Sequence, residues 1–127
     1  MAAEYPQAPA AESVMRDEAG HEFIRLGIGA RRDIITELGF TLDPELPADI
    51  AEAMTEMTAL AKDKAIMAAS LIRAADIEKA LPADDPGAAR AAAVAELMLH
   101  ECLRNYSMNY NLARAERLRK RDQAGKE

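Results

Sequence analysis

Two pairs of residues have the types and spacing needed to bind a metal ion. Glu18 and His21 are three residues apart, and Glu96 and His100 are four residues apart. On a helix, either spacing places a carboxylate and an imidazole on one face, about one turn apart, where together they can ligate a cation. A metal-binding helical bundle that uses these four residues is therefore one hypothesis for the function.

Other chemical motifs are missing from the sequence. Cys102 is the single cysteine and lies two residues from His100, so on a helix the two side chains would not face each other. The chain has no glycine-rich phosphate loop and no paired-cysteine motif. We therefore expect a protein that is not an enzyme and has no cofactor, and one cysteine allows no internal disulfide.

The composition favours helices throughout. Of the 127 residues 28 are alanine and two are valine, and tryptophan is absent. Residues that favour strands are thus scarce, and an all-α fold is predicted, with no sheet. Apolar residues at steps of three and four predict helices over residues 13–26, 30–38, 47–80 and 87–121. Gly27 and Gly29 mark a predicted turn, and Gly39 is a predicted helix cap.

These helices are expected to form a small helical bundle, with two short N-terminal helices and two long antiparallel helices joined by a loop at 81–87. Residues 47–80 fit one long helix or two with a bend near residues 62–64, and we favour one because no glycine or proline interrupts them. Leu71 and Leu99 are predicted to lie in the seam of the long helices. Aspartate at either position should then unfold the protein or break its assembly.

The chain is expected to contain one domain. Residues 1–11 are predicted to be a flexible arm, residues 12–121 a single helical domain, and residues 122–127 a flexible tail. The arm carries an acid and two prolines and no apolar run, so no targeting segment is expected. No run of about 18 apolar residues occurs, so we expect no contact with a membrane and a cytoplasmic location.

Charge is distributed unevenly along the chain, whose formal net charge is −6. Residues 1–113 hold 10 basic and 19 acidic side chains, whereas residues 114–127 hold six basic and three acidic ones. The acidic body disfavours nucleic acid as a partner. Long amphipathic faces and segregated charge instead favour a non-enzymatic protein–protein interaction module, which would act as an adaptor, an assembly subunit or an inhibitor-like partner.

The expected partner of this module is another protein or a second copy of the chain in a homo-oligomer. Apolar side chains at helical spacing would fill a groove shared with the partner, and the basic C-terminal end would meet an acidic surface. The residues predicted to bind the partner are Met57, Met67, Met98, Tyr106, Arg114, Arg117 and Arg121.

One local pattern resembles a known family. Phe23, Leu26, Arg31 and Ile34, followed by Leu38-Gly39-Phe40, have the spacing of the short helix–turn–helix of bacterial effector-associated, death-like adaptor domains. The resemblance covers residues 23–40. It implies a helical interaction module that couples the components of a defence system.

Overall fold

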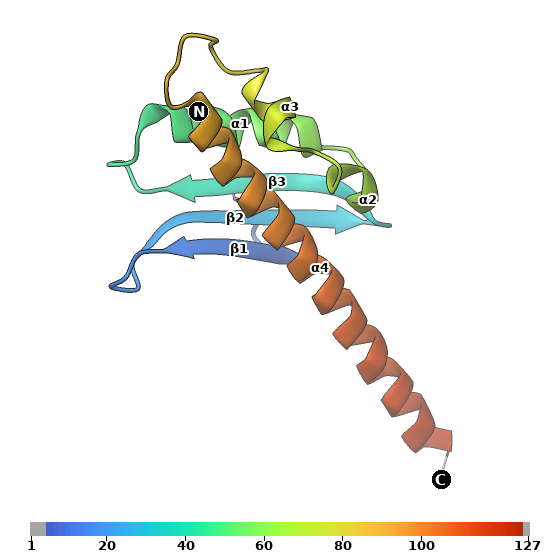
Figure 1. Ribbon diagram of the computed structural model, residues 1–127. Coiled ribbons are helices and arrows are strands. Elements are labelled where there is room, and N and C mark those ends of the chain that lie inside the picture. Colours follow the sequence, from blue (N-terminus) through green and yellow to red (C-terminus); the bar gives the residue numbers. More distant parts are fainter. Residues whose placement is uncertain (1–4, 126–127) are drawn as a thin grey trace.

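The protein contains a three-stranded antiparallel sheet, so the predicted all-α helical bundle is wrong. The computed structural model describes residues 5–125, with side chains up to residue 123. Strands β1 (Ala11–Arg16), β2 (Glu22–Arg31) and β3 (Ile34–Leu42) lie side by side in that order. They precede helices α1 (Ala48–Ala61), α2 (Ile66–Ala69), α3 (Ala74–Glu78) and α4 (Ala88–Gly125) (Figure 1). The chain is therefore an α/β fold.

Alternation of apolar residues explains why residues 22–31 form a strand. Ile24, Leu26 and Ile28 are buried on the face covered by the helices, and the residues between them face the other way. The helices predicted over 13–26 and 30–38 are replaced by the three strands, and so is the helix–turn–helix implied over residues 23–40. The predicted turn at 27–29 lies inside β2, and the predicted cap at residue 39 lies inside β3.

The turn between β2 and β3 is built from two residues that are not glycine. Arg32 and Asp33 have φ values of 54° and 63°, which is the left-handed conformation of a tight two-residue hairpin. The strands then pair from Arg31 with Ile34 to Ile24 with Leu42, with one irregularity next to Ala30. Asparagine and glycine usually occupy such turns, so the residue types here give no turn signal.

The helix predicted over 47–80 is broken at residues 62–65. Helix α1 ends at Ala61 because Lys62 has an extended backbone, with a ψ of 137°, and Asp63 follows in the left-handed region with a φ of 66°. The broken segment pairs with the edge of β3, because the Ile35 amide donates to the Lys64 carbonyl at 2.8 Å and the Asp63 amide donates to the Ile35 carbonyl at 2.9 Å. The predicted single helix is therefore wrong. The break considered near residues 62–64 is present, but a second break at 70–73 separates α2 from α3, so the segment contains three helices rather than two.

The helices cover one face of the sheet and form a two-layer core with it. Helix α4 crosses the sheet diagonally, α1 lies beside β3, and α4 continues beyond the edge at β1 (Figure 1). The buried Ser13 hydroxyl on β1 donates to the Met98 carbonyl of α4 at 2.8 Å, which ties the two layers together. The predicted seam of two long helices does not exist. Leu99 is nevertheless fully buried, in the core between α4 and the rest of the fold, whereas Leu71 is 70% exposed.

The C-terminal half of the chain agrees best with the sequence. Residues 81–87 form the predicted loop, and α4 confirms the last predicted helix. Residues 122–125 of the predicted tail continue α4, whereas residues 126–127 lie outside the described residues. Residues 5–10 of the predicted arm precede β1, and residues 1–4 lie outside the described part. No helix within residues 5–125 has the length and apolar character needed to cross a membrane.

Candidate functional site

The first predicted metal pair lies at the turn between β1 and β2. His21 Nε2 is 2.9 Å from Asp43 Oδ2, just after β3, and Glu18 is exposed. The hydrogen bond and the negative charge of Asp43 raise the pKa of His21. The pKa of Asp43 is lowered, mainly by the backbone amide of Glu45 and then by His21. This imidazole is therefore engaged in an ion pair at the end of the sheet.

The second predicted metal pair lies on α4, where both side chains contact the segment around α3. His100 Nε2 is 2.9 Å from the carbonyl oxygen of Ile72. The Glu96 carboxylate accepts a hydrogen bond from the Ala74 amide at the start of α3. The histidine of each predicted pair is thus hydrogen-bonded at a different place in the fold. Within residues 5–125, no three His, Cys, Asp or Glu side chains lie close enough together to hold a metal ion.

Cys102 is part of the core rather than of a reactive site. Its side chain is fully buried, with Sγ 3.9 Å from the Leu26 carbonyl oxygen of β2. Burial raises the pKa of the Cys102 thiol to about 12, because a thiolate would lose its hydration there. The thiol is therefore protonated at neutral pH and behaves as a small apolar side chain.

Of the residues predicted to bind a partner, two are buried in the core and the others are partly or fully exposed. Met57 and Met98 are fully buried within the core, so they are not accessible to a partner in this structure. Tyr106 is half-buried, and its hydroxyl donates to Asp33 Oδ1 at 2.9 Å, which ties α4 to the β2–β3 turn. Met67 is 82% exposed. The three arginines predicted with it, Arg114, Arg117 and Arg121, are all exposed on α4.

A charged cluster on the outer face of the sheet holds the N-terminal segment in place. Arg25 donates to Glu12 and to Glu22, each at 2.7 Å, and the Tyr5 hydroxyl donates to Glu12. The pKa of Glu12 is lowered, first by the Tyr5 hydrogen bond and then by Arg25. The Tyr5 ring lies so close to Gly27 that a Cβ there would be 2.7 Å from it. Because each charge of this cluster is paired, we assign it a structural role.

A cleft of about 340 Å³ between α2 and α4 is the first accessible site. Two arginines and a histidine line it, Arg73, Arg104 and His100, and none of its lining residues is acidic. Met67 from α2 supplies its exposed apolar part. The other lining residues are Ile66, Ser70, Leu103 and Ser107. The cleft therefore combines apolar surface with positive charge.

The same face of α4 continues beyond the cleft without covering elements. Residues 107–123 are all exposed, and they extend past the sheet (Figure 1). At steps of three and four from Leu103, this face carries Ser107, Tyr110, Arg114, Leu118 and Arg121. Tyr110 and Leu118 are about half exposed, at 50% and 49%. We call the cleft and this face together the α2–α4 surface.

Met67, Arg114 and Arg121 of this surface were predicted from the sequence as partner-binding residues, but the cleft that Met67 lines was not predicted. A continuous helix over 47–80 would place Met67 and Leu71 on its buried face with Met57. The break at Asp63 instead resets the helical phase, so that Ala69 is buried and both of those side chains face solvent. Three consecutive charged residues at 62–64 were the available signal for this break.

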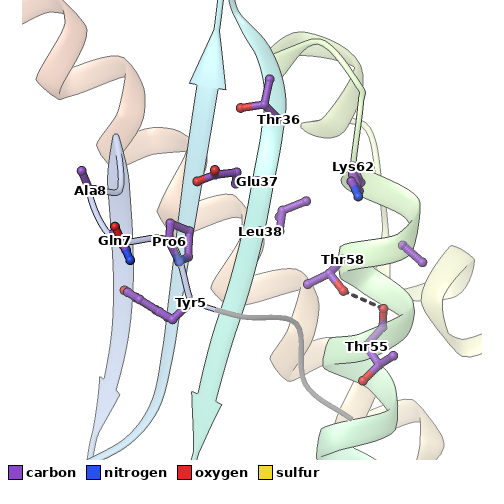
Figure 2. A pocket seen from close by; sticks show the side chains of 11 residues that line it. Tyr5, Pro6, Gln7, Ala8, Thr36, Glu37, Leu38, Thr55, Thr58 and Lys62 are labelled. Atoms are coloured by element: carbon purple, nitrogen blue, oxygen red, sulfur yellow. Dashed lines mark hydrogen bonds between the residues drawn. The ribbon is translucent and has the colours of Figure 1, made fainter.

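A second accessible site is a groove of about 740 Å³ between β3 and α1. Figure 2 shows Thr36, Glu37 and Leu38 of β3 on one side of the groove. On the other side lie Thr55 and Thr58 of α1 and Lys62, which directly follows this helix. Ala59 and the N-terminal residues Tyr5, Pro6, Gln7 and Ala8 complete the lining. We call this site the β3 groove.

The sequence matches no protein-family model and no curated protein.

Proposed function

We propose that the chain is a non-enzymatic protein–protein interaction module, whose α2–α4 surface binds an acidic amphipathic helix of another protein. The observation that supports this most is the lining of the cleft, where exposed Met67 lies among Arg73, Arg104 and His100 without an acidic side chain. An amphipathic helix that docks in a groove offers apolar side chains at steps of three and four. Carboxylates beside those side chains would pair with the arginines of the surface.

The length of the surface also suits a helical ligand. From Leu103 to Arg121 the face spans 19 residues of α4, and the 18 steps between them cover about 27 Å at 1.5 Å per residue. Four exposed arginines follow one another at positions 114, 117, 119 and 121, with Lys120 among them. Within residues 5–125, the ion pair recorded for these cations is that of Lys120 with Glu116, at 3.8 Å on the exposed helix. The arginines therefore offer charge to a partner.

A partner of a different sequence is favoured over a second copy. Helix α1 carries three acidic residues and no basic one, so it is the acidic helix that a second copy would offer. Its apolar residues Ile50, Met54 and Met57 are, however, buried in the core of the same chain. A second copy could present the acidic side of α1 but not an apolar face, and would leave the cleft around Met67 unfilled.

A labelled synthetic helix tests the proposal directly. The probe is an amphipathic peptide of about 18 residues, with leucines at steps of three and four and glutamates elsewhere, followed by fluorescence anisotropy. Arg104→Glu combined with Arg114→Glu should weaken binding by about tenfold or more, because both arginines then repel the probe. A control with Arg31→Glu and Arg90→Glu makes the same change of net charge at exposed positions outside the surface, and should alter binding by less than about twofold.

Three results would contradict the proposal. The probe could fail to bind, the two double variants could bind it equally, or a lysine version of the probe could bind as tightly as the glutamate version. Light scattering at about 100 µM protein provides a separate check on self-association. A dimer that Arg104→Glu and Arg114→Glu dissociate would show that a second copy, rather than another protein, occupies the surface.

A further inference from the structure

We infer that the cleft between α2 and α4 is a phosphate-binding site, in which Arg73, Arg104 and the hydroxyl of Ser107 hold a phosphomonoester. This site rests on the proposed function, because the phosphate is the charged group that a partner would bring to the cleft. The same chemistry could come from a phosphorylated side chain of that partner or from a free phosphomonoester.

The three side chains reach the cleft from different elements. Arg73 lies between α2 and α3, whereas Arg104 lies on α4. Ser107 follows Arg104 by three residues, so these two side chains lie on one face of the helix. All three are exposed and line the same space of about 340 Å³. A ligand in the cleft can therefore contact both arginines and the hydroxyl together.

Contacts with α4 fix the backbone on both sides of Arg73. His100 Nε2 is 2.9 Å from the carbonyl oxygen of Ile72, which is buried. The Glu96 carboxylate accepts a hydrogen bond from the Ala74 amide. Ile72 and Ala74 directly flank Arg73, whose own side chain stays exposed. The backbone of this arginine is therefore held in place before a ligand binds, which reduces the entropy lost on binding.

The positive charge of the cleft is not neutralised by the protein. Within the described part of the chain, no recorded ion pair involves Arg73 or Arg104. Asp76 accepts a hydrogen bond from the backbone amide of Arg73 at 2.9 Å, and Glu101, three residues before Arg104, does not line the cleft. The chain has 22 acidic and 16 basic side chains, and the β3 groove is lined by one of each. Two arginines in a lining without an acid therefore attract an anion.

The charge and the donors of the cleft fit a phosphomonoester better than a carboxylate. A phosphomonoester on a side chain carries about −1.5 to −2 charges at pH 7 and has three strong acceptor oxygens. Each guanidinium carries one positive charge and a planar fork of donors, which can form two parallel hydrogen bonds with a phosphate. Ser107 adds a hydroxyl donor. A carboxylate has a single charge, so it would leave one of the two arginines without a counter-charge.

An NMR titration of the full chain with a capped phosphoserine residue tests the site. The probe should shift the side-chain Nε–H signals of Arg73 and Arg104 with a Kd of about 1 mM or below, and a capped glutamate should bind about tenfold more weakly. Arg73→Gln combined with Arg104→Gln should weaken binding of the phosphoserine by about tenfold or more. Arg31→Gln combined with Arg90→Gln makes the same change of net charge at exposed positions outside the cleft, and should alter binding by less than about twofold.

Three results would overturn the inference. The capped glutamate could bind as tightly as the phosphoserine, or the two double variants could bind the phosphoserine equally. Dimethyl phosphate, a diester with a single charge like the backbone of a nucleic acid, could also bind as tightly as the phosphomonoester. We expect this diester to bind as weakly as the glutamate, because it offers one charge to two guanidiniums.

A phosphorylated helix identifies the source of the phosphate. The glutamate helix that probes the α2–α4 surface is made with phosphoserine at each of four consecutive central positions in turn, which covers one turn of the helix. A gain of about tenfold at one position supports a phosphorylated partner, and no gain at any position supports a free phosphomonoester. If the glutamate helix binds but the capped phosphoserine does not, only the phosphate site is refuted. If the capped phosphoserine binds but the helix does not, only the helical partner is refuted.

Discussion

Aspartate at Leu99 and aspartate at Leu71 should have very different effects on stability. Leu99 is fully buried on α4, whereas Leu71 is 70% exposed after α2. Removing a buried leucine side chain costs about 2–5 kcal/mol. A buried polar group without a partner costs about 1–3 kcal/mol more, and a charged one costs more than that. The total for Leu99→Asp, about 3–8 kcal/mol, is comparable with the whole stability of a domain, about 5–15 kcal/mol.

Aspartate at the exposed Leu71 should change the stability very little. At Leu71 the new carboxylate stays hydrated, so the free energy of unfolding should change by less than about 0.5 kcal/mol. Leu99→Ala is an intermediate variant that introduces no charge, and should cost about 2–5 kcal/mol while the protein still folds. Urea denaturation followed by circular dichroism measures all three variants against the wild type. If Leu71→Asp lowered the midpoint as much as Leu99→Asp, or if Leu99→Asp kept the wild-type midpoint, our placement of the core would be refuted.

Two further predictions concern titratable groups. Cys102 should react with iodoacetamide at about pH 8 far more slowly in the native protein than in urea, because burial raises its pKa to about 12. Equal rates would show that the thiol is accessible. His21→Ala should lower the free energy of unfolding at about pH 6 but not at about pH 9. The pKa of His21 is raised in the folded protein, so protonated His21 stabilises the fold below the pKa of the unfolded chain, near 6.5. This stabilisation is lost as the pH rises through the raised pKa of the folded protein. The ion pair between His21 and Asp43 is also lost as the pH falls through the lowered pKa of Asp43. A difference in unfolding free energy between wild type and His21→Ala that does not change with pH would contradict this assignment.

The helical half of the fold could be predicted because its signals are local. Pro82, Asp85, Pro86 and Gly87 mark the loop before α4, and steps of three and four in the apolar residues predict the helix that follows. The break after α1 was harder to predict, since Asp63 adopts its left-handed conformation without a glycine or proline nearby. Its conformation is supported by pairing with Ile35 of β3, which is distant in sequence.

The sheet was missed because composition outweighed alternation. Ile24, Leu26 and Ile28 alternate with other residues at the period of a strand, and this was the available signal. Gly27 between them suggested a turn, but its actual role is to admit the Tyr5 ring against the outer face of the sheet. Such a close approach between distant segments depends on the fold. Sequence spacing alone could not indicate it.

The accessible sites were predicted only in part for the same reason. Arginines at the C-terminal end of α4 were found from charge alone, because a long exposed helix keeps its sequence pattern on its surface. The cleft beside Met67 exists because α2 lies next to α4 in the fold. Met57 and Met98 were expected at a surface, and they are buried because the sheet supplies a second layer that the sequence analysis did not include.

A ligand that binds the packed half of α4 loses less entropy to ordering than one that binds the exposed half, residues 107–123. A separate helix of about 17 residues is only marginally stable in water, because its first turn is costly to form. In this chain that first turn is already formed, since residues up to Leu103 are packed in the core and the exposed residues only extend the helix. A partner at the cleft therefore meets a preorganised surface and loses little affinity to ordering. Toward Arg121 the helix is free to fray, so each contact there must first offset the entropy of the turn that carries it.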